Sequence, residues 1–111
     1  MTTKNFKLKA DEFVHLVPQM GGCFATDKIT VDGMKVGFMY REESDEQMDS
    51  GWRFFSGTED QDYVDDPNNT MTYNVNTIAN YDRAIIPYLG LPFGTELERI
   101  ENTDEFQIIA E

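Results

Sequence analysis

The strongest local signal in the chain is the segment Ile29-Thr30-Val31-Asp32-Gly33-Met34-Lys35-Val36-Gly37-Phe38-Met39-Tyr40. Apolar residues alternate with other residues on both sides of the pair Asp32-Gly33. An Asp-Gly pair between two alternating runs is typical of a type I′ turn, because glycine adopts positive φ at no cost and aspartate tolerates it. The segment therefore predicts a β-hairpin.

Further strands are predicted on both sides of this hairpin. Residues 22–26 form a short apolar run before it, and residues 52–57 alternate after it. Residues 106–109 alternate near the C-terminus, Leu97 lies in a plausible partner strand, and Asn102-Thr103-Asp104 is typical of the turn between them. These segments predict a sheet of mostly antiparallel strands.

Helix signals are weaker than strand signals. Residues 13–17 have helical spacing that Pro18 ends, and residues 59–66 form an acidic stretch compatible with one helical turn. A third helix, with Asn76 as a possible N-cap, would place three side chains on one face: Ile78, Tyr81 and Ile85. The sequence predicts an α+β fold, a mostly antiparallel sheet with two or three short helices, in a single domain over residues 1–111.

Composition excludes several classes of partner. The chain has 111 residues with a formal net charge of −12, and hydrophobic residues make up 40% of it. That apolar content argues against disorder, while the charge would repel the phosphates of nucleic acid and an anionic membrane. No apolar stretch approaches the roughly 20 residues of a transmembrane helix. We expect no nucleic-acid or membrane partner.

The chain is poor in catalytic and metal-binding side chains. Cys23 is the single cysteine and His15 the single histidine, so no internal disulfide can form and a cytoplasmic location is expected. A Cys–His catalytic pair is conceivable, but a small buried cysteine is favoured. One histidine and one cysteine cannot supply the ligands of a transition-metal site. We expect no catalytic residue, no metal and no cofactor.

Negative charge is concentrated in residues 41–66, which hold ten acidic residues against Arg41 and Arg53. Such a field accelerates the capture of a basic protein and orients the encounter. The nine candidate partner-binding residues are Glu43, Asp45, Glu46, Asp49, Glu59, Asp60, Asp62, Asp65 and Asp66. A solvated acidic face is the simpler interpretation of such a run, and calcium binding by residues 59–68 is a weaker alternative, because the run lacks the glycine of an EF-hand loop.

Trp52 lies between the two acidic runs. A tryptophan can anchor an interface, because it offers a large rigid apolar face at small entropic cost. Its alternation with Phe54 within a predicted strand favours a place in the core instead.

Three stretches resemble one bacterial family, the immunity protein thirty-three family of predicted immunity proteins in polymorphic toxin systems. They are residues 23–43, 49–57 and 73–82, and the resemblance is strongest over residues 20–100. The family's motif residues correspond to Gly51, Trp52, Gly57, Asn76 and Thr77. An aspartate often stands in this family where this chain has Asn74, which weakens any role that needs a carboxylate there.

The resemblance implies a small non-enzymatic α+β protein of the bacterial cytoplasm that neutralises a toxin. Toxin domains are often basic nucleases, and an acidic inhibitor suits such a target. We therefore expect an immunity protein that binds a basic toxin through an acidic surface. Two alternatives stay open: a stand-alone binding module with an apolar pocket near Trp52 and Phe55, and an enzyme with carboxylates of raised pKa in a cleft. The sequence predicts no oligomeric state.

Overall fold

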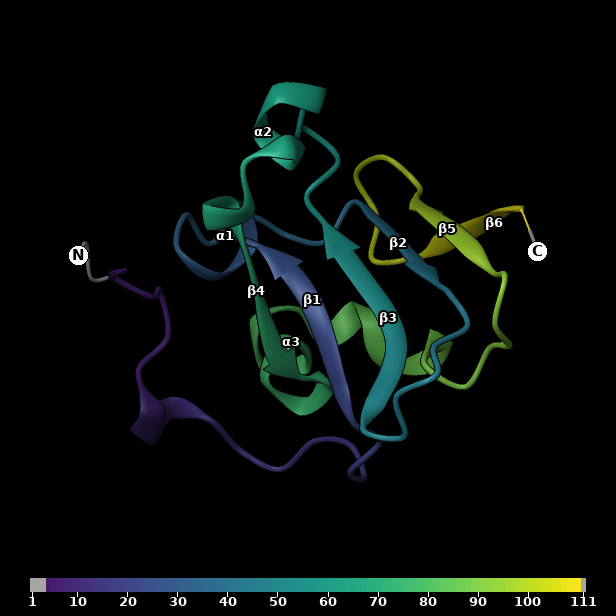
Figure 1. Cartoon of the computed structure of the whole chain (residues 1–111), viewed down its shortest axis with the longest axis horizontal. Helices are drawn as coiled ribbons and strands as arrows, with labels where there is room; N and C mark the ends of the chain where they lie inside the picture. Colours follow the sequence, from purple (N-terminus) through teal and green to yellow (C-terminus); the bar gives the residue numbers. More distant parts are fainter. Residues whose placement is uncertain (1–3, 111) are drawn as a thin grey trace.

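The computed structural model describes residues 4–110 and consists of one six-stranded sheet with short helices (Figure 1). The strands lie side by side in the order β4-β1-β3-β2-β5-β6. Their bounds are β1 Gly22–Thr26, β2 Phe38–Arg41, β3 Asp49–Phe55, β4 Thr70–Asn74, β5 Glu96–Arg99 and β6 Phe106–Ala110. The α-helices are α1 Asp27–Thr30, α2 Gln61–Asp65 and α3 Val75–Tyr81, and the 3-10 helices are η1 Ala10–Glu12, η2 Pro67–Asn69 and η3 Arg83–Tyr88.

The sheet is mostly antiparallel, and the α+β fold is confirmed. β1 and β3 pair in parallel at the centre, and the other neighbours pair antiparallel. The register of the central pair shifts, because Gly22 pairs with Asp49 but Phe24 pairs with Arg53. β3 therefore carries extra residues near its start, in the manner of a β-bulge.

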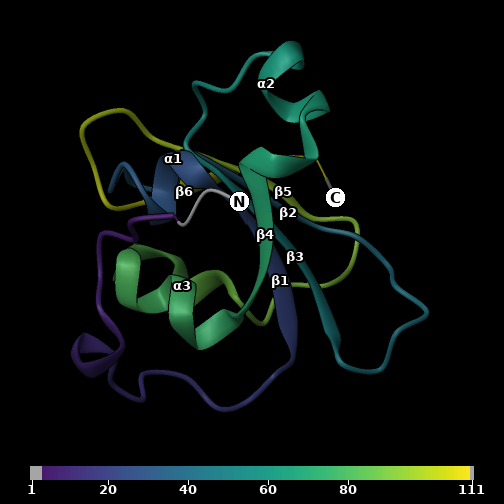
Figure 2. The ribbon, with the colours of Figure 1, turned by 60° about the vertical axis from the view of Figure 1, so that its left-hand side comes forward.

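The core lies between one face of the sheet and the segments α3 and η3, which pack behind the sheet in Figure 1 and to its left in Figure 2. From the sheet the core takes Cys23, Ala25, Met39, Trp52, Phe54 and Leu97, and from the covering segments Val75, Ile78 and Ile85. Trp52 is completely buried, and its indole Nε1 donates a hydrogen bond to the carbonyl oxygen of Leu89 at 3.1 Å. The expectation that Trp52 belongs to the core is confirmed.

The predicted hairpin at residues 29–40 is wrong in its first half. Ile29 lies in α1, and Gly33, at φ +77°, donates its backbone N–H to the carbonyl of Ile29 at 3.1 Å. A glycine of positive φ also ends helices, so the same Asp-Gly pair closes a helical turn here. The second half of the prediction holds, because β2 begins at Phe38.

Two helix predictions are corrected. Residues 13–17 are irregular, because side chains of α3 rather than a local helix bind their backbone groups. α3 is capped by Asn74, whose Oδ1 accepts from the N–H of Asn76 at 3.0 Å, and Ile85 lies beyond the helix in η3. The strands at 22–26 and 106–109 are confirmed, and α2 falls within the predicted acidic stretch.

No described helix is long and apolar enough to span a membrane.

Candidate functional site

The surface of the sheet that faces away from α3, called the open face below, faces the viewer in Figure 1. Side chains alternate between the two faces of a strand, so the residues between the core positions point to this surface. One row of directly paired residues crosses it: Thr72, Phe24, Arg53, Tyr40 and Glu96. The next row consists of Phe55, Phe38, Glu98 and Gln107. The open face thus carries aromatic, cationic and acidic side chains rather than a uniform polar surface.

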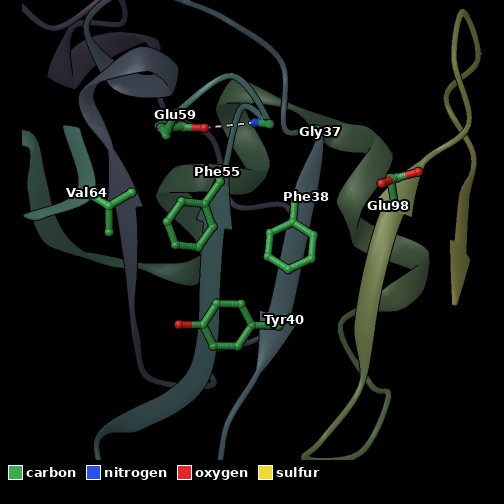
Figure 3. Close-up of a pocket in the computed structure, with 8 residues that line it drawn as sticks. Gly37, Phe38, Tyr40, Phe55, Glu59, Val64 and Glu98 are labelled. Carbon is green, nitrogen blue, oxygen red and sulfur yellow. Dashed lines mark hydrogen bonds between the residues drawn. The ribbon is translucent and has the colours of Figure 1, made fainter. Parts of the chain in front are cut away.

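Three aromatic rings gather at the centre of the open face. The ring centroids of Tyr40 and Phe55 lie 5.9 Å apart with an interplanar angle of 12°, and Phe38 lies 5.8 Å from Tyr40 and 5.9 Å from Phe55. Figure 3 shows Glu59 above the ring of Phe55 and Glu98 beside the ring of Phe38, with Tyr40 below these two rings. Each ring is partly exposed, so the cluster presents apolar surface to solvent.

The rings line a hollow of about 530 Å³. Val64 of α2 forms one wall, and Glu98 of β5 forms another (Figure 3). A second hollow of about 170 Å³ shares Tyr40, Phe55 and Val64 with the first and extends toward Arg53. The two hollows form one groove along β3, within the size range of small-ligand sites or interface pockets.

Arg53 lies under this groove, and two carboxylates balance its positive charge. Its guanidinium makes a bidentate pair with Asp49, at 2.9 Å and 2.8 Å, and its Nε bonds Glu42 at 2.7 Å. The guanidinium carbon also lies 4.3 Å from the ring centroid of Phe24. The hydrogen bonds from Arg53 hold the pKa of Asp49 far below its ordinary value, and the same pairing raises the pKa of Arg53. Both groups therefore stay charged, as a structural ion pair does.

Glu59 is a fixed carboxylate at the upper end of the groove. Its Oε2 accepts from the Thr26 hydroxyl at 2.5 Å and from the Ser56 N–H at 2.8 Å, while Oε1 accepts from the Gly57 N–H at 2.9 Å. Burial raises the pKa of Glu59, but the hydrogen bonds from Thr26 and Ser56 outweigh burial and bring the pKa below its ordinary value. Glu59 thus orders the loop after β3 and holds a negative charge beside the rings.

A family comparison matches this chain over residues 23–110 to the immunity protein Imm33 domain. The chain belongs to the Imm33 immunity-protein family. No curated protein and no solved structure matches it significantly. The resemblance seen in the sequence is confirmed, and the matched range includes the whole sheet except Gly22, the first residue of β1.

The residues that the sequence predicts as family motif residues have structural roles in the fold. Gly51 has φ +89°, and a Cβ on it would overlap the carbonyl oxygen of Glu42, so glycine allows β2 and β3 to approach at the bulge. Gly57 has φ +94° and turns the chain toward Glu59. Trp52 fills the core. These three residues shape the open face from beneath rather than from its surface.

Of the two residues of α3 that are predicted as motif residues, Asn76 holds the N-terminal segment. Asn76 Oδ1 accepts from the N–H groups of Leu16 at 2.7 Å and Val17 at 3.1 Å, and its Nδ2 donates to the carbonyl of Val14 at 2.9 Å. Thr77 lies next to it in α3 and is partly buried. Asn74 serves as N-cap, a task that aspartate performs equally well, so the aspartate expected from the family resemblance would fit the same geometry. Sequence reasoning missed the tether, because a helical asparagine does not reveal a distant partner.

The nine candidate partner-binding carboxylates divide between the two ends of β3. Glu43, Asp45, Glu46 and Asp49 lie before or at its start, and Glu59, Asp60, Asp62, Asp65 and Asp66 lie after its end. Over a strand of this length the two groups are about 20 Å apart, so the rings of the open face lie between them. The acidic sequence runs therefore flank the aromatic cluster.

Some of these carboxylates have structural tasks. Asp49 pairs with Arg53, Glu59 orders its loop, and Asp60 and Asp66 accept backbone N–H groups as N-caps of α2 and η2. The remaining members are exposed: Glu43, Asp45, Glu46, Asp62 and Asp65. The exposed set is available for contact with a partner.

The α2 end also has cations nearby. The Nζ of Lys28 lies 5.2 Å from the ring centroid of Tyr63, and the Nζ of Lys4 donates to the carbonyl of Asn68 at 2.6 Å. These cations offset part of the negative charge at that end of β3.

The residues considered for chemistry are not gathered in a cleft. Cys23 is buried, and burial raises the pKa of its thiol to about 12, while His15 is exposed on an irregular segment. Within residues 4–110, no three His, Cys, Asp or Glu side chains are arranged to hold a metal ion.

Proposed function

We propose that this Imm33 protein neutralises a cognate bacterial toxin by binding it through the open face, without chemistry of its own. The observation that carries the proposal is the exposed ring cluster of Phe38, Tyr40 and Phe55, with acidic groups at both ends of β3. Membership in an immunity-protein family supports a toxin protein as the partner; we take it to belong to a polymorphic toxin system, and the acidic ends favour a basic toxin. The reducing bacterial cytoplasm is the proposed location.

The layout of the open face resembles the anatomy of a protein interface. Aromatic residues carry most of the binding energy in such interfaces, and a polar rim surrounds them. The exposed carboxylates would speed the encounter with a basic toxin, while the rings would set the dissociation rate. The pKa values of Asp49 and Glu59 are lowered by their hydrogen bonds, so neither carboxylate suits a general acid, which needs a raised pKa.

The direct test is co-expression with the protein encoded next to this chain. We expect growth to be rescued from that protein's toxicity and the two proteins to co-purify. Phe38→Ala and Tyr40→Ala should each weaken binding at least about tenfold, as truncated hot-spot residues do. Val14→Ala is the control, because Val14 is an exposed apolar residue whose backbone is bound by α3, on the other side of the sheet. Unrescued growth, or ring variants that bind like the control, would reject the proposal.

A second test addresses the acidic ends. Four exposed carboxylates are changed together to their amides: Glu43, Asp45, Glu46 and Asp62. Association should slow by about tenfold at low salt and lose most of its salt dependence, with the dissociation rate nearly unchanged. Asp49 and Glu59 stay unaltered because they stabilise the fold. Association rates equal to the parent's at every salt concentration would remove the acidic ends from the mechanism.

A stand-alone binding module is the second candidate, and the hollow of about 530 Å³ at Phe55 favours it. The hollow lies on the opposite face of the sheet from Trp52, which is in the core. If no toxin partner exists, the binding of a small ligand in this hollow is the function that the geometry supports second best.

A further inference from the structure

Several aromatic rings of this molecule have a cation of the same chain over their face, but the three rings of the hollow do not. The guanidinium carbons of Arg53, Arg41 and Arg99 lie 4.3, 4.6 and 4.8 Å from the centroids of Phe24, Phe93 and Phe106. Within residues 4–110, no lysine or arginine of the chain itself lies over the rings of Phe38, Tyr40 or Phe55. These rings offer their electron-rich faces to a cation from outside.

The charges around the hollow favour such a cation. Glu98 is an exposed carboxylate on one wall, and Glu59 is a fixed carboxylate on another (Figure 3). Glu96 lies on the same face beside Tyr40, and Glu42 and Asp49 neutralise the one cation beneath the groove, Arg53. Five carboxylates thus stand against the guanidinium of Arg53 and the ammonium of Lys28 at the α2 end, so a positive group entering the hollow meets net attraction.

We propose that the hollow between Phe38, Tyr40 and Phe55 receives an arginine side chain of the bound toxin, with Glu98 as its carboxylate partner. This inference rests on the proposed function and names the residue that anchors the toxin. Tyr40 and Phe55 are nearly parallel, at 12°, and a planar guanidinium stacks on such a surface while its fork of N–H donors stays free for Glu98. A lysine ammonium is more strongly hydrated and cannot stack, so arginine is the better occupant.

The test uses the full ¹⁵N-labelled chain and short blocked peptides, without the toxin. The probes are acetyl-Gly-Arg-Gly-amide, its citrulline counterpart, which has the same shape without the charge, and its lysine counterpart. We expect the arginine peptide to bind with a dissociation constant of about 1–10 mM and to shift the amide resonances of Phe38, Tyr40, Phe55 and Glu98. The citrulline peptide should bind at least about tenfold more weakly, and the lysine peptide should fall between the two.

A matched pair of variants locates the carboxylate. Glu98→Gln should weaken the binding of the arginine peptide by about threefold or more. Glu101→Gln is the control, because Glu101 is an exposed residue of the turn between β5 and β6, and this change should leave the binding unaltered. Equal binding of the arginine and citrulline peptides would overturn the inference. Absence of shifts at the hollow up to about 50 mM arginine peptide would also overturn it.

Failure of the inference and failure of the proposed function can be told apart. If the toxin binds the open face but the arginine peptide does not bind the hollow, the arginine anchor is rejected and the proposed function stands. If the arginine peptide binds the hollow but no toxin partner is found, the pocket assignment stands and the proposed function is rejected.

Discussion

Replacing Asn76 by alanine tests whether this predicted motif residue supports the fold or contacts a partner. The change removes three hydrogen bonds: Oδ1 to the N–H groups of Leu16 and Val17, and Nδ2 to the carbonyl of Val14. Each bond contributes about 0.5–1.5 kcal/mol net, and water replaces part of this at a half-exposed site. Alanine has a higher helix propensity than asparagine, by about 0.6 kcal/mol, which offsets part of the loss. The expected net loss of unfolding free energy is about 1–3 kcal/mol.

Denaturant unfolding measures this loss, and hydrogen exchange shows where it arises. The melting temperature should fall by about 4 °C per kcal/mol for a chain of this size. The amides of Leu16 and Val17 should exchange much faster in Asn76→Ala, because their acceptor is gone, while the amides of β3 follow only the global stability. Thr77→Ala is the control, because within residues 4–110 the Thr77 side chain makes no hydrogen bond, and it should stay within about 0.5 kcal/mol. An Asn76→Ala protein as stable as this control, with unaltered exchange at Leu16 and Val17, would refute the tether.

Three further predictions follow from buried and paired groups. Trp52→Phe should cost about 2–4 kcal/mol in denaturant unfolding, because it leaves the buried carbonyl of Leu89 unpaired and the core underfilled. Asp49 has a depressed pKa in the folded state, so its stabilising contribution is present above the unfolded pKa near 4 and is lost as the pH falls below it. Asp49→Asn should therefore lower the unfolding free energy by about 1–3 kcal/mol at pH 7, since Arg53 keeps only one carboxylate, Glu42. Below about pH 4, the unfolding free energy of this variant should fall less steeply than that of the parent protein. Cys23, with its buried thiol and a pKa raised to about 12, should react with a thiol reagent only at the rate of unfolding, and fast labelling of the native protein would contradict the core assignment.

Sequence patterns predicted the sheet better than its connections. The strand at 22–26 and the alternation around Trp52 were sufficient to place β1 and β3, because apolar side chains recur at every second residue on the core face, although residues 50–54 of β3 are buried on both faces. The Asp-Gly pair at 32–33 was ambiguous, since a hairpin turn and a helix C-terminus both use a glycine of positive φ. Only the tertiary packing separates the two, because Ile29 belongs to α1 and is completely buried in the core.

The candidate site was predicted in part. The acidic runs were visible in the sequence, but their separation by β3 depends on the chain path, which composition does not contain. The ring cluster joins Phe38 and Tyr40 of one strand with Phe55 of another, and a one-residue change of register would have sent these side chains into the core. Asn76 and Glu59 are ordinary polar residues in the sequence, and their roles come from groups up to 62 residues away in the chain.

The division of negative charge between the two ends of β3 leads to a last prediction. The ends lie about 20 Å apart, more than twice the Debye length of about 8 Å at physiological ionic strength, so each acts on its own part of the partner. Two double variants separate them: Glu43→Gln with Glu46→Gln at the start of β3, and Asp62→Asn with Asp65→Asn on α2.

The free-energy effects of the two double variants on association should add at physiological salt, and the first pair should have the larger effect, because Lys28 and Lys4 already offset charge near α2. Both pairs should leave the dissociation rate nearly constant, since the rings between them hold the complex. A larger effect from the α2 pair, or dissociation rates that rise with either pair, would show that the partner is held by the acidic ends and not by the aromatic centre.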